Sequence, residues 1–308
     1  MRTRRSGILP CCVLVAAICG GCGKAPPSKA EITQFLEVVQ QGDAASVNRL
    51  LKTRANPELL NAVGKDGTTP LTEAVAAGHV DLAKLLIERG ADVKAKGKWY
   101  QAPLHWAAEK GEKGIAELLL AKGADPNTRT DALLTVTIGS DRYAWSCPTP
   151  VAMASLRGHA EVVALLLTHG ADPNISDPSL GLTALHVAVL GGHEEVVRLL
   201  LEKGAEVNAQ EALEGGTPLH MAVAWDRDKI IGVLLAKGAD PNTPDRSGGT
   251  PLHRAARRAK GARLAELLVA GGANTAVKDR NGQTPLQLAA SLGNKPVVKV
   301  LRRQQVVR

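Results

Sequence analysis

The sequence predicts an all-α solenoid of about eight stacked helix-turn-helix units, and two periodic features carry this prediction. A proline, once an alanine, opens an apolar helix at intervals of 33 or 34 residues, with one longer interval of 47. A glycine followed by alanine closes the units with a matching period. Such a unit cannot bury its own apolar faces, so it requires copies on either side. The helix openings are Pro70, Pro103, Pro150, Ala184, Pro218, Pro251 and Pro285, and the closing glycines are Gly90, Gly123, Gly170, Gly204, Gly238 and Gly272.

Residues 215–242 show how one unit is built. Thr217 supplies a side-chain oxygen for the helix N-terminus, and Pro218 takes the first helical position, where its missing N–H costs nothing. Apolar residues then recur at helical spacing in two successive helices. Gly238 ends the second helix at a position where a positive φ favours glycine.

Three helix openings share the motif Pro-Leu-His-x-Ala. It stands as PLHWAA from Pro103, and with a preceding threonine as TPLHMA from Thr217 and TPLHRA from Thr250. Together with the period, this motif resembles the ankyrin repeat family. The resemblance covers residues 64–303 and implies an ankyrin-repeat solenoid with β-hairpin fingers between units. It also implies that the chain mediates protein–protein contacts and is not an enzyme.

The segments on either side of the repeats do not keep the period. We expect a signal peptide over residues 1–21 and a tether over 22–30. An N-terminal capping repeat is expected over 31–63, with two amphipathic stretches but no TPL motif, and a C-terminal tail over 304–308.

The N-terminal segment has the composition of a secretory signal. Arginines at positions 2, 4 and 5 precede a short apolar run over 8–18, which is short for a membrane span. The following Cys19-Gly20-Gly21-Cys22 resembles a bacterial lipoprotein lipobox, although Cys19 stands where that family usually has leucine. The resemblance implies lipid on the Cys22 thiol and a lipid-anchored protein in the bacterial cell envelope, facing the periplasm or the exterior. An ordinary cleaved signal with an incidental cysteine is the alternative.

The interval of 47 residues contains an insert over 128–148. Apolar residues alternate with threonine from Leu134 to Ile138, a Gly-Ser-Asp turn follows, and residues 142–145 complete a strand-turn-strand pattern. We therefore expect one lengthened β-hairpin finger, and a partner-contacting patch formed by aromatic side chains near solvent. The alternative is that the rings pack against the neighbouring finger. The four aromatic residues are Trp99, Tyr100, Tyr143 and Trp145.

A second candidate surface lies on the first helix of each unit, at positions that the resemblance places on the concave side. In the middle units these positions hold large apolar residues where water-exposed side chains are expected, which favours an interaction groove. The alternative is mutual burial of adjacent side chains. The predicted groove residues are Trp106, Met153, Leu156, Val187, Leu190, Met221 and Trp225, continued at the basic end by Arg254, Arg257 and Arg258.

Charge is divided unevenly along the chain. Residues 246–308 contain 13 basic and 2 acidic residues, a net charge of +11, whereas residues 22–245 have a net charge of −6. A basic end attracts anionic lipid or an acidic protein, or it simply keeps the end of the solenoid soluble. The export signal and the absence of aromatic residues after Trp225 argue against nucleic acid.

The sequence predicts no catalytic, metal or cofactor site. Seven of the eight histidines occupy repeat positions to which the resemblance assigns structural hydrogen bonds, and Cys147 has no histidine or acid beside it. No metal-ligand spacing, phosphate loop or nucleophile elbow occurs. We therefore expect a non-enzymatic scaffold that binds another protein. The alternative is an inhibitor or immunity-type protein that occludes an exported enzyme.

Overall fold

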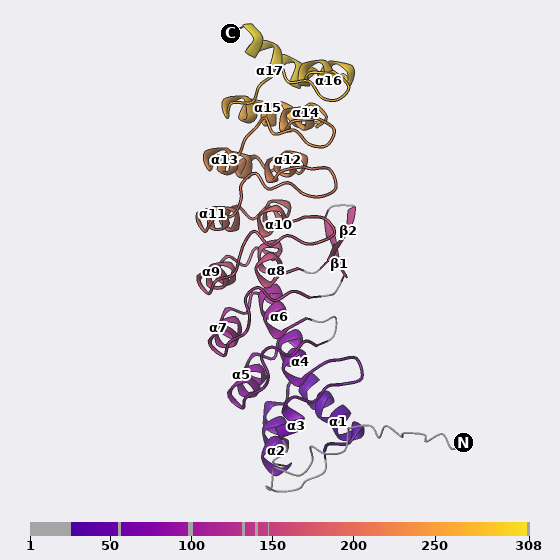
Figure 1. Cartoon of the computed structure of the whole chain (residues 1–308), viewed down its shortest axis with the longest axis vertical. Helices are drawn as coiled ribbons and strands as arrows, with labels where there is room; N and C mark the ends of the chain where they lie inside the picture. The colour runs from indigo at the N-terminus through magenta and orange to yellow at the C-terminus, as the bar shows by residue number, and fades with distance from the viewer. Residues whose placement is uncertain are drawn as a thin grey trace, which may run out of the picture.

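The computed structural model describes residues 26–54, 57–97, 101–130, 133–138, 141–146 and 148–306. In these residues eight antiparallel helix pairs stack into one elongated array, with the first and last pairs at opposite ends of the stack (Figure 1). The pairs are α1 (Lys29–Gln40) with α2 (Ala44–Arg54), α4 (Pro70–Ala77) with α5 (Val80–Glu88), α6 (Pro103–Lys110) with α7 (Lys113–Ala121), α8 (Pro150–Arg157) with α9 (Ala160–Thr168), α10 (Ala184–Gly191) with α11 (Glu194–Glu202), α12 (Pro218–Ala224) with α13 (Asp228–Ala236), α14 (Pro251–Ala256) with α15 (Gly261–Ala270), and α16 (Pro285–Ser291) with α17 (Lys295–Val306). The predicted fold class is confirmed.

Four of the first helices begin where the sequence predicts because the threonine before the proline accepts a capping hydrogen bond from the helix N-terminus. Thr217 adopts an extended conformation and accepts a hydrogen bond from the His220 backbone N–H. Thr284 accepts the same bond from Gln287. The first helix then ends on a left-handed glycine in several units, as at Gly192 with φ 80°. Only glycine adopts this conformation without a steric penalty, so the chain reverses there into the second helix.

The core is one continuous layer of aliphatic side chains running between consecutive units. Leu185 and Leu200, on the two helices of one unit, are fully buried, and alanines such as Ala188 let neighbouring helices approach closely. Each first helix contacts the first helices of the units before and after it, and each second helix does the same on its own side. Burial therefore depends on neighbours, as expected for a solenoid.

The insert is a two-stranded hairpin between α7 and α8. Strand β1 (Leu133–Ile138) pairs antiparallel with β2 (Asp141–Ser146), and Ile138 lies opposite Asp141. The lengthened finger predicted from the alternating threonines is therefore present, and β2 begins one residue earlier than expected. The Ser146 hydroxyl links this finger to the next one through a 2.7 Å hydrogen bond with the Ser179 hydroxyl.

The first helix pair differs in detail from the prediction. The helix α1 begins after Ser28, which accepts from the Glu31 backbone N–H while Glu31 accepts from the Ser28 backbone N–H, a complete capping box. It therefore starts two residues before the expected Glu31. A further short helix, α3 (Pro57–Leu60), follows α2 and was not predicted.

The glycine at an inter-helix turn also leaves room for the histidine ring of the next unit, and a pair of substitutions tests this. A Cβ built at Gly158 would lie 2.4 Å from Nδ1 of His193, whereas a Cβ at Gly170 meets nothing within 4 Å. Both glycines have a positive φ, 79° and 87°, so alanine strains both backbones to a similar extent. We expect Gly158→Ala to lower the free energy of unfolding by about 1–3 kcal/mol more than Gly170→Ala, measured by urea unfolding. Equal losses would show that contact with His193 is unimportant.

No helix in the described residues is both long and apolar enough to span a bilayer. The predicted signal peptide and Cys22 lie outside the described residues, as does Cys147.

Candidate functional site

A cleft of ≈ 600 Å³ lies across the first helices α10, α12 and α14, where the sequence predicts the interaction groove. Three of the predicted apolar residues line it, namely Leu190, Met221 and Trp225. Two of the predicted arginines, Arg254 and Arg258, line its basic end. We call this cleft the α10–α14 groove.

The opposite wall of the α10–α14 groove comes from the fingers and was not predicted. Leu180 and Leu182 belong to the finger before α10, and Leu213 to the finger before α12. The side chain of Leu213 is 56% exposed, one of the most exposed large apolar side chains in the described residues. An exposed leucine beside a partly buried tryptophan is typical of a surface that a partner covers.

The continuous apolar groove expected over the middle units is interrupted. Met153 and Val187 are only 3% and 2% exposed, because neighbouring helices cover them, so they offer almost no surface to a partner. Leu190 is 5% exposed and contributes only an edge to the cleft. For Met153 and Val187 the prediction of an exposed groove position is wrong, and mutual burial is the correct interpretation.

Trp106 and Leu156 are partly buried and pack against the hydrophobic core. Neither lines the α10–α14 groove. The structure thus brings Leu190, Met221 and Trp225 together and leaves Trp106 and Leu156 nearer the N-terminal end.

The finger loops that form the groove wall are held by carboxylates at their bases. The Asp177 side chain accepts hydrogen bonds from the backbone N–H groups of Leu180 and Leu182, at 2.8 and 2.7 Å. Glu211 accepts from Glu214 and Gly216 in the next finger, both at 2.8 Å. Backbone N–H groups in a loop have no partner from a helix or strand, and these carboxylates accept their hydrogen bonds instead. The leucines are therefore presented on fixed loops.

Adjacent fingers are also joined through their backbones. The Ala212 N–H donates to the Leu180 carbonyl at 2.7 Å, and the Arg246 N–H donates to the Glu214 carbonyl at 2.7 Å. The finger tips therefore form one connected rim along the groove.

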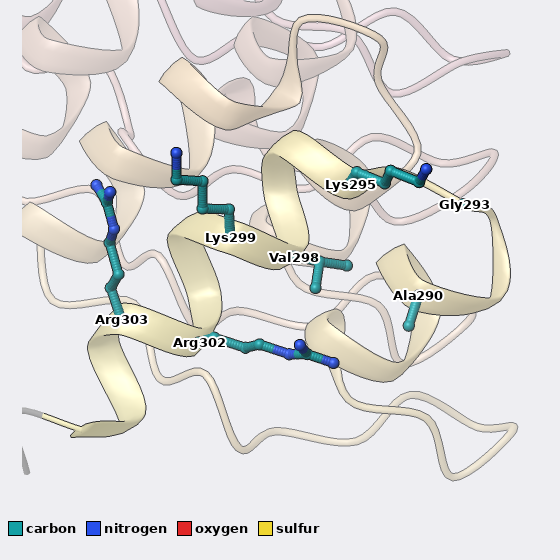
Figure 2. Close-up of a pocket in the computed structure, with 7 residues that line it drawn as sticks. All are labelled: Ala290, Gly293, Lys295, Val298, Lys299, Arg302 and Arg303. Atoms are coloured by element: carbon teal, nitrogen blue, oxygen red, sulfur yellow. The ribbon is translucent and has the colours of Figure 1, made fainter.

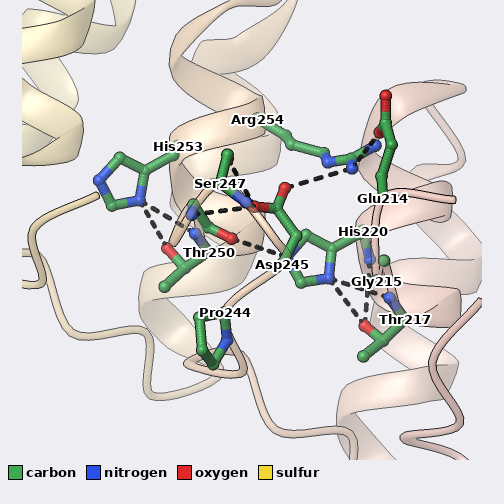
Figure 3. Close-up of polar contacts among 12 residues, drawn as sticks. Glu214, Gly215, Thr217, His220, Pro244, Asp245, Ser247, Thr250, His253 and Arg254 are labelled. Atoms are coloured by element: carbon green, nitrogen blue, oxygen red, sulfur yellow. Dashed lines mark hydrogen bonds and ion pairs between the residues drawn. The ribbon is translucent and has the colours of Figure 1, made fainter. Parts of the chain in front are cut away.

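Arg254 ties two fingers to the helix face at the basic end of the groove (Figure 3). Its guanidinium Nη2 donates to Glu214 Oε2 at 2.6 Å and to Asp245 Oδ2 at 3.2 Å. Burial acts to raise the pKa of Asp245, but hydrogen bonds from Ser247 and the nearby Arg254 charge outweigh it and lower that pKa. Asp245 is thus a carboxylate at neutral pH.

A second ion pair lies on the other side of the groove. Arg258 donates from Nε and Nη2 to the two carboxylate oxygens of Asp226, at 3.3 and 2.6 Å, and this hydrogen bonding raises the pKa of the guanidinium. Asp226 has φ 53° and occupies the turn position where other units have glycine. The substitution of aspartate for glycine gives up an unstrained turn and provides the partner for Arg258 in the next unit.

Arg257, the third predicted arginine, does not line the α10–α14 groove. It lines a neighbouring hollow of ≈ 590 Å³ together with Arg246 and Ser247. Arg254 and Arg258 are neutralised within the protein, so Arg257 is the exposed member of the predicted set with no ion pair among the described residues.

Five of the repeat histidines bond to a backbone carbonyl of a neighbouring unit, as the repeat positions predict, whereas Nε2 of His105 and of His186 is buried without a hydrogen-bond partner in the described residues. The ring nitrogen Nε2 of His220 lies 3.1 Å from the Gly249 carbonyl, and that of His253 lies 3.0 Å from the Gln283 carbonyl, one finger further along. The histidines after the inter-helix glycine reach back instead, as His193 does to the Leu156 carbonyl at 2.9 Å. Arg227 replaces histidine in its unit and donates to the Leu190 carbonyl at 2.8 Å.

Burial keeps three of the repeat histidines neutral at pH 7. Burial lowers the pKa of His105, His186 and His220 from 6.5 to about 4. Nδ1 of His186 and of His220 lies beside the N-cap threonine of its own helix, and Nδ1 of His105 accepts from the Ala102 backbone N–H, so all three rings hold the turn. In the described residues no group of three or more histidine, cysteine, aspartate or glutamate side chains is placed to hold a metal ion.

The aromatic finger patch lies outside what the structure describes. Trp99 and Tyr100 are not among the described residues, and for Tyr143 and Trp145 only the backbone, in β2, is described. These four residues stay a prediction.

The sequence did contain a signal for the missed groove wall. The fingers that start at Asp177 and Glu211 are one residue longer than the one at Asp245, and they carry leucine where that finger carries serine and glycine. Apolar residues in loops of otherwise polar turn composition would have marked this surface.

Comparison with known proteins agrees with this architecture. Residues 35–130, 151–245 and 219–307 match the family model described as ankyrin repeats (3 copies). The human ASB11 ankyrin repeat domain is similar in structure, with a TM-score of 0.62 and 30% sequence identity over 76% of this chain and 96% of that domain.

Two curated proteins are similar over shorter stretches. The human Notch-regulated ankyrin repeat-containing protein is 36% identical over 61 residues, which is 20% of this chain and 54% of that protein. The serine/threonine-protein kinase VIK of Arabidopsis thaliana is 44% identical over 59 residues, 19% of this chain and 13% of the kinase. The chain therefore spans about half or less of the length of these curated relatives.

Proposed function

Because the chain belongs to the ankyrin repeat family, whose members generally mediate protein–protein interaction and are typically not enzymes, we propose that it is a scaffold that binds a partner protein through the α10–α14 groove. One observation carries the proposal: apolar side chains of Leu213, Met221 and Trp225 converge on a ≈ 600 Å³ cleft with fixed walls. A cleft of this size accommodates one or two large apolar side chains of a partner.

The ion-paired arginines at the edge of the groove affect how a partner is oriented and which partners are excluded. Arg254 and Arg258 already satisfy Glu214, Asp245 and Asp226, so the groove offers paired charges beside its apolar floor. Paired charges at a rim favour orientation and exclusion of wrong partners more than affinity. Most of the binding free energy then comes from burying apolar surface.

Capture from a membrane extract tests the groove. We expect Trp225→Ala to abolish or strongly weaken capture of the partner, because truncating a central tryptophan of an interface costs about 2 kcal/mol or more. Trp106→Ala is the control, since it removes the same kind of side chain from a first helix outside the cleft. Both variants are first checked for helical circular dichroism. Equal capture by the wild type and by Trp225→Ala would refute the groove.

The finer part of the proposal concerns location. We infer export and a lipid on Cys22, because a basic segment, a short apolar run and small residues precede that cysteine. The protein would then be anchored in the bacterial cell envelope and would face the periplasm or the exterior. We expect Cys22→Ala to move the protein from the membrane to the soluble fraction when the membranes are washed at high salt, which releases proteins held by surface charge alone. An unchanged membrane fraction would contradict anchoring through this residue.

An inhibitor or immunity-type role would use the same groove to occlude an exported enzyme. The capture experiment separates the two roles, because an inhibited enzyme would be recovered inactive and would regain activity on release.

A further inference from the structure

The last helix pair of the described residues presents a basic face. A hollow of ≈ 630 Å³ on this face is lined by Lys295, Lys299, Arg302 and Arg303 of α17. Figure 2 shows these four side chains spread along the helix, with Val298 and Ala290 between α17 and α16.

The position of this face in the repeat explains its apolar strip. In the α12–α13 unit, Val223 holds the position of Ala290 and Ile231 holds the position of Val298. Val223 and Ile231 are fully buried by the unit that follows them. Here Ala290 is exposed and Val298 is partly exposed, since no further unit covers them in the described residues. Small apolar side chains are therefore left at the centre of the face.

A neighbouring position has changed from apolar to charged. Leu167, Leu201, Leu235 and Val269 occupy the same place in successive second helices, and Arg302 occupies it in α17. An arginine there opposes stacking of another unit, because the contact would bury its charge without a partner. This face is thus adapted to something other than another repeat or a second copy of the same solenoid.

The four cations are not neutralised within the protein. None of them has a carboxylate partner in the described part of the chain, in contrast to Arg254 and Arg258. The other end of the array is mixed in sign, with Glu31 and Glu37 beside the basic residues of α1 and α2. A merely solubilising cap needs no single sign of charge, so the one-sided composition points to an anionic ligand.

Exposed apolar surface beside the cations narrows the class of ligand. Leu292, in the turn between α16 and α17, is 56% exposed. A helix with four or more Lys and Arg residues next to exposed apolar side chains is typical of attachment to anionic membranes, where the cations meet headgroup phosphates and the apolar residues enter the interface. Nucleic acid would favour aromatic residues for base stacking, and no aromatic residue follows Trp225.

We propose that the α16–α17 end face binds the surface of an anionic phospholipid bilayer through Lys295, Lys299, Arg302 and Arg303, with Leu292 inserting between headgroups. This binding does not depend on lipid at Cys22. If Cys22 is lipidated, as proposed above, the protein has two membrane attachments, the lipid before the first unit and the basic face of the last unit. The first and last units lie at opposite ends of the stack (Figure 1).

Vesicle co-sedimentation tests the proposal on the full chain carrying Cys22→Ala, so that a failed lipid anchor cannot affect the result. The probes are phosphatidylcholine vesicles with and without phosphatidylglycerol at low ionic strength. We expect binding only to the anionic vesicles, and a loss of binding of roughly six hundredfold when the four cations are changed together to glutamine, since each basic residue near an anionic surface contributes roughly fivefold. Leu292→Ser alone is expected to weaken binding less.

The matched control removes four exposed lysines that lie in the second helices of earlier units or directly after them, with the same change in net charge. Lys84→Gln, Lys122→Gln, Lys203→Gln and Lys229→Gln together are expected to leave most of the binding intact. Equal losses in the two quadruple variants would show attraction by net charge alone and would overturn the proposal. Binding of the Cys22→Ala protein with all four cations intact to both kinds of vesicle, or to neither, would also overturn the proposal. Binding to an oligonucleotide but not to anionic vesicles would overturn it in favour of nucleic acid.

Discussion

Acidification from pH 7 to pH 4 is expected to lower the free energy of unfolding by several kcal/mol. Burial lowers the pKa of His105, His186 and His220 to about 4 in the folded chain, against 6.5 in the unfolded chain. Below pH 6.5 the unfolded chain therefore takes up protons that the folded chain refuses, so stability is fully present above pH 6.5 and is lost as the pH falls toward 4. One pKa unit is worth about 1.4 kcal/mol, so each histidine contributes on the order of 3 kcal/mol.

The chain itself offers the control for this prediction. In the last unit Gln287 takes the histidine position, and its Oε1 accepts from the Thr284 N–H at 2.9 Å, as the histidine ring does in other units. We expect His220→Gln to remove about one third of the slope of unfolding free energy against pH between 5 and 6.5, measured by urea unfolding at a series of pH values. A slope that is unchanged in His220→Gln, or absent in the wild type, would mean that these rings are protonated in the fold.

Leu185→Ala is expected to destabilise the solenoid by about 2–5 kcal/mol. Leu185 is completely buried in the middle of the array, and its truncation leaves a cavity among units on both sides. Because each unit is stabilised by its neighbours, a defect in the central unit weakens two interfaces at once.

Leu213→Ala removes the same atoms from the groove wall and provides the comparison. That side chain is 56% exposed, so we expect a change in unfolding free energy within about 0.5 kcal/mol and a clear loss of partner capture. Thermal and urea unfolding of the two variants, together with capture from a membrane extract, measure both effects. A large stability loss in Leu213→Ala would show that the leucine belongs to the core and not to a binding surface.

The helix starts and ends were predictable because their causes are local. The Thr-Pro pair at 217–218 caps and opens its helix, and glycines such as Gly192 take the left-handed conformation at its end. The hairpin of β1 and β2 followed from the alternation of apolar residues with threonine from Leu134 to Ile138. The short helix α3 was missed, since four residues give no periodic signal.

The candidate site was predicted only in part because exposure depends on neighbouring units. Met153 and Met221 hold the same repeat position, yet Met153 is 3% exposed and Met221 lines the groove. The ion pairs of Arg254 join residues 9 and 40 positions apart, which no local pattern reveals.

The sequence by itself determined the repeat, the order of the helices, the lengthened finger and the uneven charge, because each rests on residue types at fixed spacing within one unit. Only the tertiary structure decided which apolar side chains face solvent, which arginines are already paired, and which carboxylates fix the finger loops. The physical reason is that burial and ion pairing are set by contacts between units, and these contacts form only when the copies stack.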